Sequence, residues 1–322
     1  MNVLRTLIVL WLSLGVTLPV SAQTFPSRPA RIVVPFPPGG TSDATARILA
    51  EKLTQHWGQN VLVDNRGGAG GNIAAEHVAR SAADGYTLLM GTHGTQAINI
   101  SLFRKLTYDP VRDFAAVTLA LSVPNLYLIH PSLPVRSIQQ LVALARARPG
   151  EINMASAGYG TMPHMAGELL NLMANVKMVP VLYKGSGSAI VDLLGGQVPV
   201  MIESMLTSLP HIKAGKLYAV AITSAQRNPG VADLPTVAES GYAGYEAITW
   251  VGILAPAATP VAILTRLHTD IAAILQSNEV RDRLRTMGAT AGGGTPEEFS
   301  AFIRSETVKW AKVVKAAGLE AQ

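Results

Sequence analysis

Four short turns carry glycine, serine and threonine between an apolar run and a stretch with helical spacing. They are PFPPGGTSDATA (35–46), GTHGTQAIN (91–99), SAGYGTMPH (156–164) and YKGSGSAIV (183–191). The first N–H groups of a helix have no intrahelical partner and carry about half a positive charge. Glycine lets a ligand approach this backbone, so such ends can bind carboxylate or phosphate without a cation. Helix capping alone explains any one of these turns, whereas their repetition favours a shared anion site.

Several side chains beside these turns could add to such a site. Glu203 ends the apolar run 198–202, where it could face an ammonium or hydroxyl group of a ligand, or bond to backbone as a structural carboxylate. Lys184 could pair with a second ligand carboxylate or be solvated. Tyr183 and Trp250 could line a pocket, although Trp250 lies in an apolar run and could equally belong to the core.

Two histidines, His93 and His164, lie in glycine-bearing turns and could donate to a carboxylate. His164 and Glu168 have i,i+4 spacing, but two ligands are a weak basis for a metal site, so no metal is expected. No cofactor is expected either, because the P-loop, dinucleotide and H-E-x-x-H motifs are absent.

Catalysis by serine is the alternative to binding. The stretch GSGSA (185–189) fails the G-x-S-x-G pattern of a nucleophile elbow. Serine, histidine and aspartate could still form a triad in another chain order. A hydrolase of a carboxylated ester or amide therefore stays open as an alternative.

The turns require a framework of alternating strands and helices. Apolar runs predict strands at 31–35, 61–63, 86–90, 125–130, 152–155, 178–182, 198–202, 217–223 and 248–254. Helical spacing predicts helices at 44–57, 73–81, 137–148, 163–173, 189–194, 260–275 and 280–287, and a last helix after Thr295. This alternation predicts an α/β fold with mostly parallel sheets and helices on both faces. Ligands of such sheets gather at the carboxyl ends of the strands.

Local signals set several helix ends. Gly58 should end the helix 44–57 as a C-cap, and Ser137 should be the N-cap of the helix 137–148. In the stretch Thr295-Pro296-Glu297-Glu298, Thr295 is the expected N-cap and Glu298 completes a capping box. The stretch 224–245 has no clear period and is expected to be a connection.

The first 22 residues are expected to be a secretory signal peptide. Arg5 precedes an apolar stretch, and Val20-Ser21-Ala22 has the small-x-small pattern of a cleavage site. A membrane anchor is less favoured, because the apolar run is shorter than the ~20 residues that a spanning helix needs. The mature chain would begin at Gln23.

A mature chain of about 300 residues is large enough for two cores. The pattern predicts one lobe from 23–124 and 247–322, and a second lobe from 125–246. The chain would cross between them near 120–127 and 224–247. Two crossings make a hinge, and ligands commonly lie between such lobes.

The composition excludes two classes. The sequence has no cysteine, which excludes a disulfide framework. The formal net charge is +5, but only 15% of the residues are charged and the aromatic residues are few. A nucleic-acid partner is therefore not expected, because such surfaces cluster cations and interleave them with aromatic side chains.

The chain resembles the receptors of tripartite tricarboxylate transporters, which are Bug-type periplasmic solute-binding proteins. The resemblance lies in RIVVPFPPGGTSDATAR, VLVDNRGGAGGNIAAEHVARSAADGYTLLMGT, LTYDPVRDFAAVT, NMASAGYGTMPHMAGELL, VLYKGSGSAIVDLLGGQVPVMIES and LPTVAESGYAGYE. It implies a two-lobed type II periplasmic-binding-protein fold that closes over a small carboxylate. Main-chain groups and ordered waters from the facing loops 38–43 and 156–161 would hold one carboxylate.

The resemblance also implies partners and a location. We expect a periplasmic monomer without enzymatic activity that presents its ligand to a membrane permease, or alternatively serves as the ligand-sensing subunit of a signalling system. Gly67 stands where proline is frequent in the family, and Glu203 stands where aspartate is frequent. Tyr159 and Met162 lie in a loop of variable composition, so the identity of the carboxylate stays open.

The ligand-binding residues expected from the turns and the resemblance together are Phe36, Gly39, Gly40, Thr41, Ser42, Asp43, Thr92, His93, Gly94, Thr95, Ser156, Gly158, Gly160, Thr161, His164, Tyr183, Lys184, Gly185, Ser186 and Glu203.

Overall fold

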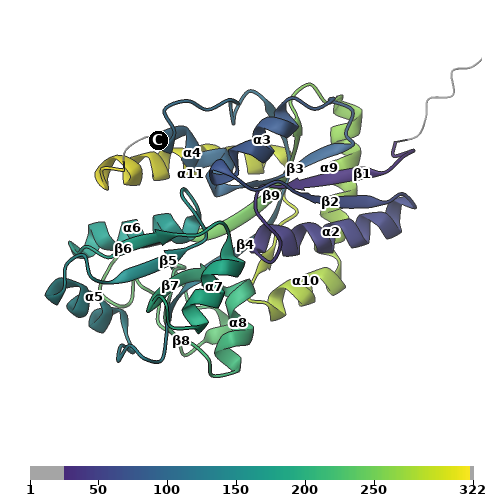
Figure 1. Cartoon of the computed structure of the whole chain (residues 1–322). Helices are drawn as coiled ribbons and strands as arrows, with labels where there is room; N and C mark the ends of the chain where they lie inside the picture. The colour runs from purple at the N-terminus through teal and green to yellow at the C-terminus, as the bar shows by residue number, and fades with distance from the viewer. Residues whose placement is uncertain (1–24, 320–322) are drawn as a thin grey trace, which may run out of the picture.

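A computed structural model describes residues 25–319, and a mixed β-sheet runs through it in the order β2-β1-β3-β9-β4-β7-β5-β6 (Figure 1). The strands are β1 (Ala30–Val34), β2 (Val61–Asn65), β3 (Thr87–Thr92), β4 (Phe114–Ile129), β5 (Asn153–Ser156), β6 (Val179–Leu182), β7 (Val200–Ser204), β8 (Tyr218–Ile222), β9 (Ile248–Pro256) and β10 (Thr290–Ala291). Strands β8 and β10 also pair with β4. The predicted signal peptide 1–22 and the start at Gln23 lie outside the described residues.

The expected parallel βα units lie at the two ends of the sheet. Strand β1 pairs in parallel with β2 and β3, and β5 pairs in parallel with β6 and β7. The central strands differ, because β9 runs antiparallel to β3 and β4, and β4 runs antiparallel to β7, β8 and β10. The long strand β4 therefore joins the two parallel ends into one sheet.

Helices cover both faces of this sheet, as the alternating pattern predicts. They are α2 (Thr41–Trp57), α3 (Asn72–Ala79), α4 (Asn99–Leu102), α5 (Ile138–Ala147), α6 (Met162–Ala174), α7 (Ser186–Leu194), α8 (Met205–Lys213), α9 (Val261–Gln276), α10 (Asn278–Thr286) and α11 (Pro296–Ala316), with short helical turns η1 (Ala69–Gly71), η2 (Gly94–Ile98) and η3 (Pro229–Val231). Figure 1 shows α3, α4 and α11 on one side of the upper part of the sheet and α2 and α10 on the other.

The described residues form three apolar clusters, one of which lies under α3 and the first half of α11. Helices α2, α7, α8, α9 and α10 pack on one face around side chains such as Leu49, Leu193 and Leu267. Helices α5 and α6 pack on the other face, with Met165 and Trp310 in their core. Among residues 25–319, no helix is long and apolar enough to cross a membrane.

The predicted helix ends are confirmed. Gly58 adopts the left-handed conformation with φ of 64°, and its N–H donates to the Thr54 carbonyl. The Ser137 side chain accepts from the Gln140 N–H. Thr295 and Glu298 form the predicted reciprocal capping box at the start of α11.

The predicted strand 125–130 was too short at its start, because β4 begins eleven residues earlier, at Phe114. Strand β4 pairs with β9 as far as Pro124, with β7 from Asn125 onward and with β8 from Leu126 onward. Helix α8 was missed altogether, because Pro210 in its interior argues against a helix in the sequence.

A buried polar cluster lies where β4 changes partners. The Asn125 Nδ2 group donates to the Ala247 carbonyl at 3.0 Å, and its Oδ1 accepts from Thr249 Oγ1 at 2.8 Å. The Asn125 N–H donates to Thr223 Oγ1 at 2.8 Å, and Thr223 Oγ1 donates to the same Ala247 carbonyl at 2.6 Å. Three chain segments that are far apart in sequence are thereby tied together at one point.

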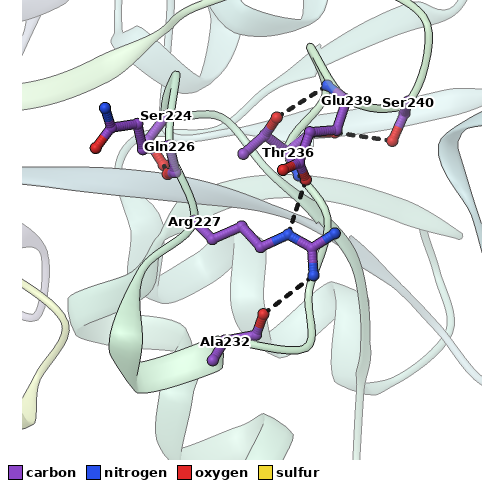
Figure 2. A network of polar contacts seen from close by, with 7 residues as sticks. All are labelled: Ser224, Gln226, Arg227, Ala232, Thr236, Glu239 and Ser240. Atoms are coloured by element: carbon purple, nitrogen blue, oxygen red, sulfur yellow. Dashed lines mark hydrogen bonds and ion pairs between the residues drawn. The ribbon is translucent and has the colours of Figure 1, made fainter.

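The connection 224–245 contains no helix or strand apart from the turn η3, as its lack of period predicts. Polar contacts order it instead (Figure 2). Arg227 Nε donates to Glu239 Oε2 at 2.9 Å, and the same oxygen accepts from the Thr236 N–H at 2.9 Å. The Glu239 N–H donates in return to Thr236 Oγ1, while Ser240 Oγ donates to the Thr236 carbonyl.

Candidate functional site

Four helix N-termini meet at one cavity of about 50 Å³ between the two ends of the sheet. Its lining residues are Phe36, Pro37, Gly40, Thr41, Ser42, His93, Ala157, Thr161, Pro163, Gly185, Ser186, Glu203, Ser204 and Thr249. Gly40, Thr161, Gly185 and Ser204 are the N-caps of α2, α6, α7 and α8 in turn. The turns 35–46, 156–164 and 183–191 thus come together as the sequence predicted.

The strands explain why these helix ends converge. Helices α2, α6, α7 and α8 follow directly on β1, β5, β6 and β7, so each begins at the carboxyl end of its strand. Gly185 has φ of 126°, which permits the sharp turn from β6 into α7. A Cβ atom built on Gly40 would lie 3.6 Å from Ser186 Oγ, so the first turns of α2 and α7 face each other closely.

The electrostatics of the cavity favour an anion. Four helix N-termini supply partial positive charge and free backbone N–H groups. Thr41, Ser42 and Ser186 add hydroxyl groups, whereas lysine and arginine are absent from the lining residues. His93 contributes no charge near neutral pH, because its burial lowers its pKa to about 3.

Glu203 is the acidic residue of the lining, and its side chain is buried. Its Oε1 accepts from the Ser204 N–H at 2.9 Å and from Thr207 Oγ1 at 2.8 Å. Its Oε2 is buried without a hydrogen-bond partner among the described residues. Burial raises the pKa of this carboxyl group above its ordinary value, and the neighbouring Thr207 and Ser186 hydroxyls and the Ser204 N–H oppose this rise in part.

Several contacts join the loops on opposite sides of the cavity. His93 Nε2 accepts from the Met162 N–H at 2.5 Å, at the start of α6. A Cβ atom on Gly94 would lie 3.1 Å from the Gly160 carbonyl oxygen, a separation that leaves little room for a side chain. The loop after β3 therefore lies directly against the loop after β5.

A second cavity, of about 520 Å³, adjoins the first and shares Phe36, Pro37 and Ala157 with it. Its other lining residues are Gly67, Gly68, Ala69, Gly70, Gly71, Gly158, Tyr159, Tyr183 and Lys184. Lys184 is the one cation that lines either cavity within residues 25–319. The Tyr183 hydroxyl is occupied by Asp192 Oδ2 at 2.7 Å, which leaves its ring to line the cavity.

The remaining predicted site residues support the loops without lining either cavity. Asp43 accepts from the Gly39 N–H and from Arg47, and Thr92 and Thr95 bond to each other. His164 Nδ1 accepts from the Gly160 N–H at 3.3 Å. Ser156 Oγ is buried without a hydrogen-bond partner among the described residues.

Packing answers the question of whether Trp250 lines a pocket or belongs to the core. Trp250 is a core residue, fully buried against Phe299 and Phe302, and its Nε1 donates to Glu306. His164 Nε2 lies 3.9 Å from Glu168 Oε1, and residues 25–319 contain no cluster that could hold a metal ion.

Five lining residues of the first cavity are absent from the sequence-based prediction: Pro37, Ala157, Pro163, Ser204 and Thr249. The second cavity adds Gly67, Gly68, Ala69, Gly70, Gly71 and Tyr159. Pro37, Ala157 and Pro163 lie inside the turns 35–46 and 156–164, but the prediction selected only the glycine, polar and aromatic residues of these turns. Ser204 follows Glu203 and caps α8, a helix that the sequence did not predict. Thr249 comes from β9, which nothing in the sequence places near the turns.

Comparisons with known proteins agree with this architecture. Residues 45–319 match the family model described as "Tripartite tricarboxylate transporter family receptor". The chain is 40% identical over 322 residues to the protein BugT of Bordetella pertussis, with 99% of each chain covered.

Solved structures show the same fold. The structure of Rpa4515 from R. palustris with adipate has a TM-score of 0.90 and 41% identity, and covers 92% of this chain and 100% of that one. MatC (Rpa3494) from Rhodopseudomonas palustris with bound malate has a TM-score of 0.86 and 33% identity, and covers 90% of this chain and 100% of that one. The fold is that of the periplasmic binding proteins, as predicted. The chain belongs to the tripartite tricarboxylate transporter receptor family, which consists of solute-binding proteins rather than enzymes.

Proposed function

We propose that this receptor captures a small dicarboxylate, one carboxylate of which occupies the cavity between the four helix N-termini. The observation that carries the proposal is the convergence of α2, α6, α7 and α8 on a cavity whose lining contains no lysine or arginine. Helix ends of this kind bind carboxylates through backbone N–H groups and nearby hydroxyls. Rpa4515 and MatC, with adipate and malate, support a ligand with two carboxylates.

The two cavities suit the two ends of such a ligand. One water molecule needs roughly 10–15 Å³ of cavity volume. The first cavity, of about 50 Å³, therefore accommodates a carboxylate group but not a whole dicarboxylate. The adjoining cavity of about 520 Å³ receives the rest, with Lys184 as the cation for the second carboxylate.

The two ends of the sheet would act as closing lobes, with 23–124 and 247–322 forming one and 125–246 the other. Strand β4 changes partners at Asn125. At the second crossing, the Asn125 backbone N–H donates to Thr223 and its side chain donates to the Ala247 carbonyl. The lobes would pivot about this cluster, and a ligand that contacts both would shift the population toward the closed form.

Delivery completes the proposed role. A signal peptide cleaved after Ala22 would export the chain to the periplasm, where it works as a monomer and presents its ligand to a membrane permease. Mass spectrometry of protein recovered from the periplasm tests the first step. A mature chain that begins at Gln23 is expected, and a chain that retains Met1–Ala22 would contradict the proposal.

Binding is tested with ligand-free protein, prepared by unfolding and refolding the mature chain. Adipate and malate are compared with their diamides in a thermal-shift assay and by calorimetry. A ligand at 100 times its dissociation constant adds about 2.7 kcal/mol to the free energy of unfolding. Stabilisation by an acid but not by its diamide supports the proposal, and a flat response to all acids, from refolded protein, refutes it.

The variant pair Ser186→Ala and Ser188→Ala locates the site. Both serines lie in the first turn of α7, but only Ser186 is buried in the cavity, whereas Ser188 is exposed and its hydroxyl donates to the Gly185 carbonyl. Loss of a hydrogen bond to a charged ligand costs about 1.5–3 kcal/mol. We expect Ser186→Ala to weaken binding about tenfold or more and Ser188→Ala to leave it unchanged.

A further inference from the structure

Glu203 lines the cavity that we assign to a ligand carboxylate. Its side chain is 2% exposed, and Oε2 has no hydrogen-bond partner within residues 25–319. None of the ion pairs found in the described part of the chain involves Glu203. The lining therefore combines a buried acidic side chain with an anionic guest and no cation to separate them.

Two carboxylates in so small a space cannot both remain ionised. Like charges at close range raise the pKa of one group strongly, as in paired carboxylates that share one proton. Glu203 lines this cavity of about 50 Å³, so a ligand carboxylate within it lies close to the Glu203 side chain. The ligand carboxylate also accepts hydrogen bonds from the backbone N–H groups of the helix ends, and these bonds favour its ionised form. Glu203 is then the group that becomes neutral.

We propose that Glu203 takes up a proton when a carboxylate ligand binds, and that its Oε2–H donates a hydrogen bond to the ligand. This inference rests on the proposed function. A protonated Glu203 can donate from Oε2, which has no other hydrogen-bond partner among the described residues, whereas an ionised carboxylate can only accept. The proton comes from solvent, and no covalent bond of the ligand changes. Burial, which already raises the pKa of Glu203 without a ligand, acts in the same direction.

The titratable groups around Glu203 do not supply this proton. His93 lines the same cavity and is neutral, with a pKa lowered to about 3 by burial. On α6, burial lowers the pKa of His164 to about 4, and that of Glu168 is raised. Tyr183, before α7, is bonded to Asp192, and its pKa is raised to about 12.

Charged groups on the other neighbouring elements lie elsewhere. On α2, Asp43 is ion-paired with Arg47 and its pKa is lowered. On α8, His211 and Lys213 lie in the last turn, at the opposite end from Glu203. Lys184 lines the adjoining cavity. Between pH 6.5 and 9, Glu203 is the group whose protonation the ligand should change.

The test is calorimetric titration of the ligand-free mature protein with adipate and with malate between pH 6.5 and 9. Buffers of different ionisation enthalpy give the number of protons taken up per ligand. We expect an uptake that approaches one proton at the alkaline end for the wild type, and none for Glu203→Gln. The Glu203→Gln variant needs no proton, so its affinity should exceed that of the wild type severalfold at pH 8.5, and the difference should close by pH 6.5.

Glu168→Gln is the matched control, because Glu168 is also a largely buried carboxyl group with a raised pKa but lines neither cavity. It should leave the proton uptake at its wild-type value. Binding by the wild type without proton uptake at any pH overturns the inference and leaves the proposed function intact. Proton uptake that persists in Glu203→Gln also overturns it. Absence of binding by both acids overturns the proposed function and the inference together.

Discussion

The Nε2 atom of His93 accepts a hydrogen bond from the Met162 N–H across the cavity, over a distance of 2.5 Å. The bond joins the loop after β3 to the first residue of α6, which lie in the two proposed lobes. It also determines the tautomer, because an accepting Nε2 leaves the ring proton on Nδ1. A neutral histidine thus serves as a contact between lobes, and its charge plays no part.

Replacing His93 should weaken ligand capture. His93→Ala leaves the Met162 N–H without a partner, which costs about 1–3 kcal/mol. Because the bond joins the two lobes, we expect most of this cost in the ligand dissociation constant, as a rise of about fivefold or more. His93→Gln, which retains an acceptor, should recover part of the affinity. Equal affinity of His93→Ala and wild type in calorimetry would show that the contact does not contribute to closure.

Lys184 should recognise the second carboxylate of the ligand. An exposed ion pair contributes about 0.2–1 kcal/mol, and more when the pair is partly desolvated. We expect Lys184→Met to weaken adipate binding about twofold to fivefold and to leave the binding of the monocarboxylate hexanoate unchanged. The comparison of the two acids is the control, since a general distortion would weaken both. An unchanged affinity for adipate would remove Lys184 from the site.

Glu203 should reduce stability at alkaline pH in the ligand-free protein. Burial raises its pKa in the folded state above the value of 4.5 that applies to an unfolded chain. The folded protein therefore binds this proton more tightly, and the associated stability is full below pH 4.5 and is lost as the pH rises through the folded-state pKa. We expect Glu203→Gln to be more stable than the wild type at pH 8, with the difference shrinking toward pH 5. Urea denaturation at both pH values measures it, and a wild type that is more stable at pH 8 would contradict it.

Asp270 should stabilise the packing of α9 against α2. Burial alone would raise its pKa, but Arg266 Nε, Trp57 Nε1 and His56 bond to the carboxylate and lower it. The ionised Asp270 therefore stabilises the folded protein above pH 3.8, and this contribution is lost as the pH falls through the folded-state pKa. Asp270→Asn should lower the free energy of unfolding by about 1–3 kcal/mol at pH 7.

The control for Asp270 is Asp282→Asn. Asp282 pairs with Arg285 on the exposed surface of α10. Exposed pairs of this kind contribute about 0–1 kcal/mol. A urea denaturation series should therefore separate the two variants clearly, and equal midpoints would argue against a structural role for Asp270.

Local sequence signals predicted the helix ends and most of the βα units well. Gly58, Ser137 and the capping box at Thr295 depend on residues within one turn of each other, so short-range chemistry decides them. The same local signals did not predict the first half of strand β4 or helix α8. The first half of β4 is a strand because β9 and β10 pair with it, and α8 forms despite Pro210 because its buried face packs in the core.

The sequence by itself determined that several helices begin at glycine-, serine- and threonine-rich turns, because these residues at the end of a strand act over a few positions. It also suggested the family, since the motifs follow one another along the chain. Only the tertiary structure decided which helix ends meet, and that α8 and Thr249 complete the cavity. The burial of Glu203 Oε2 and the bond between His93 and Met162 were likewise beyond the sequence. Each depends on residues that the fold brings together from distant elements. Neighbouring residues in the sequence carry no information about such contacts.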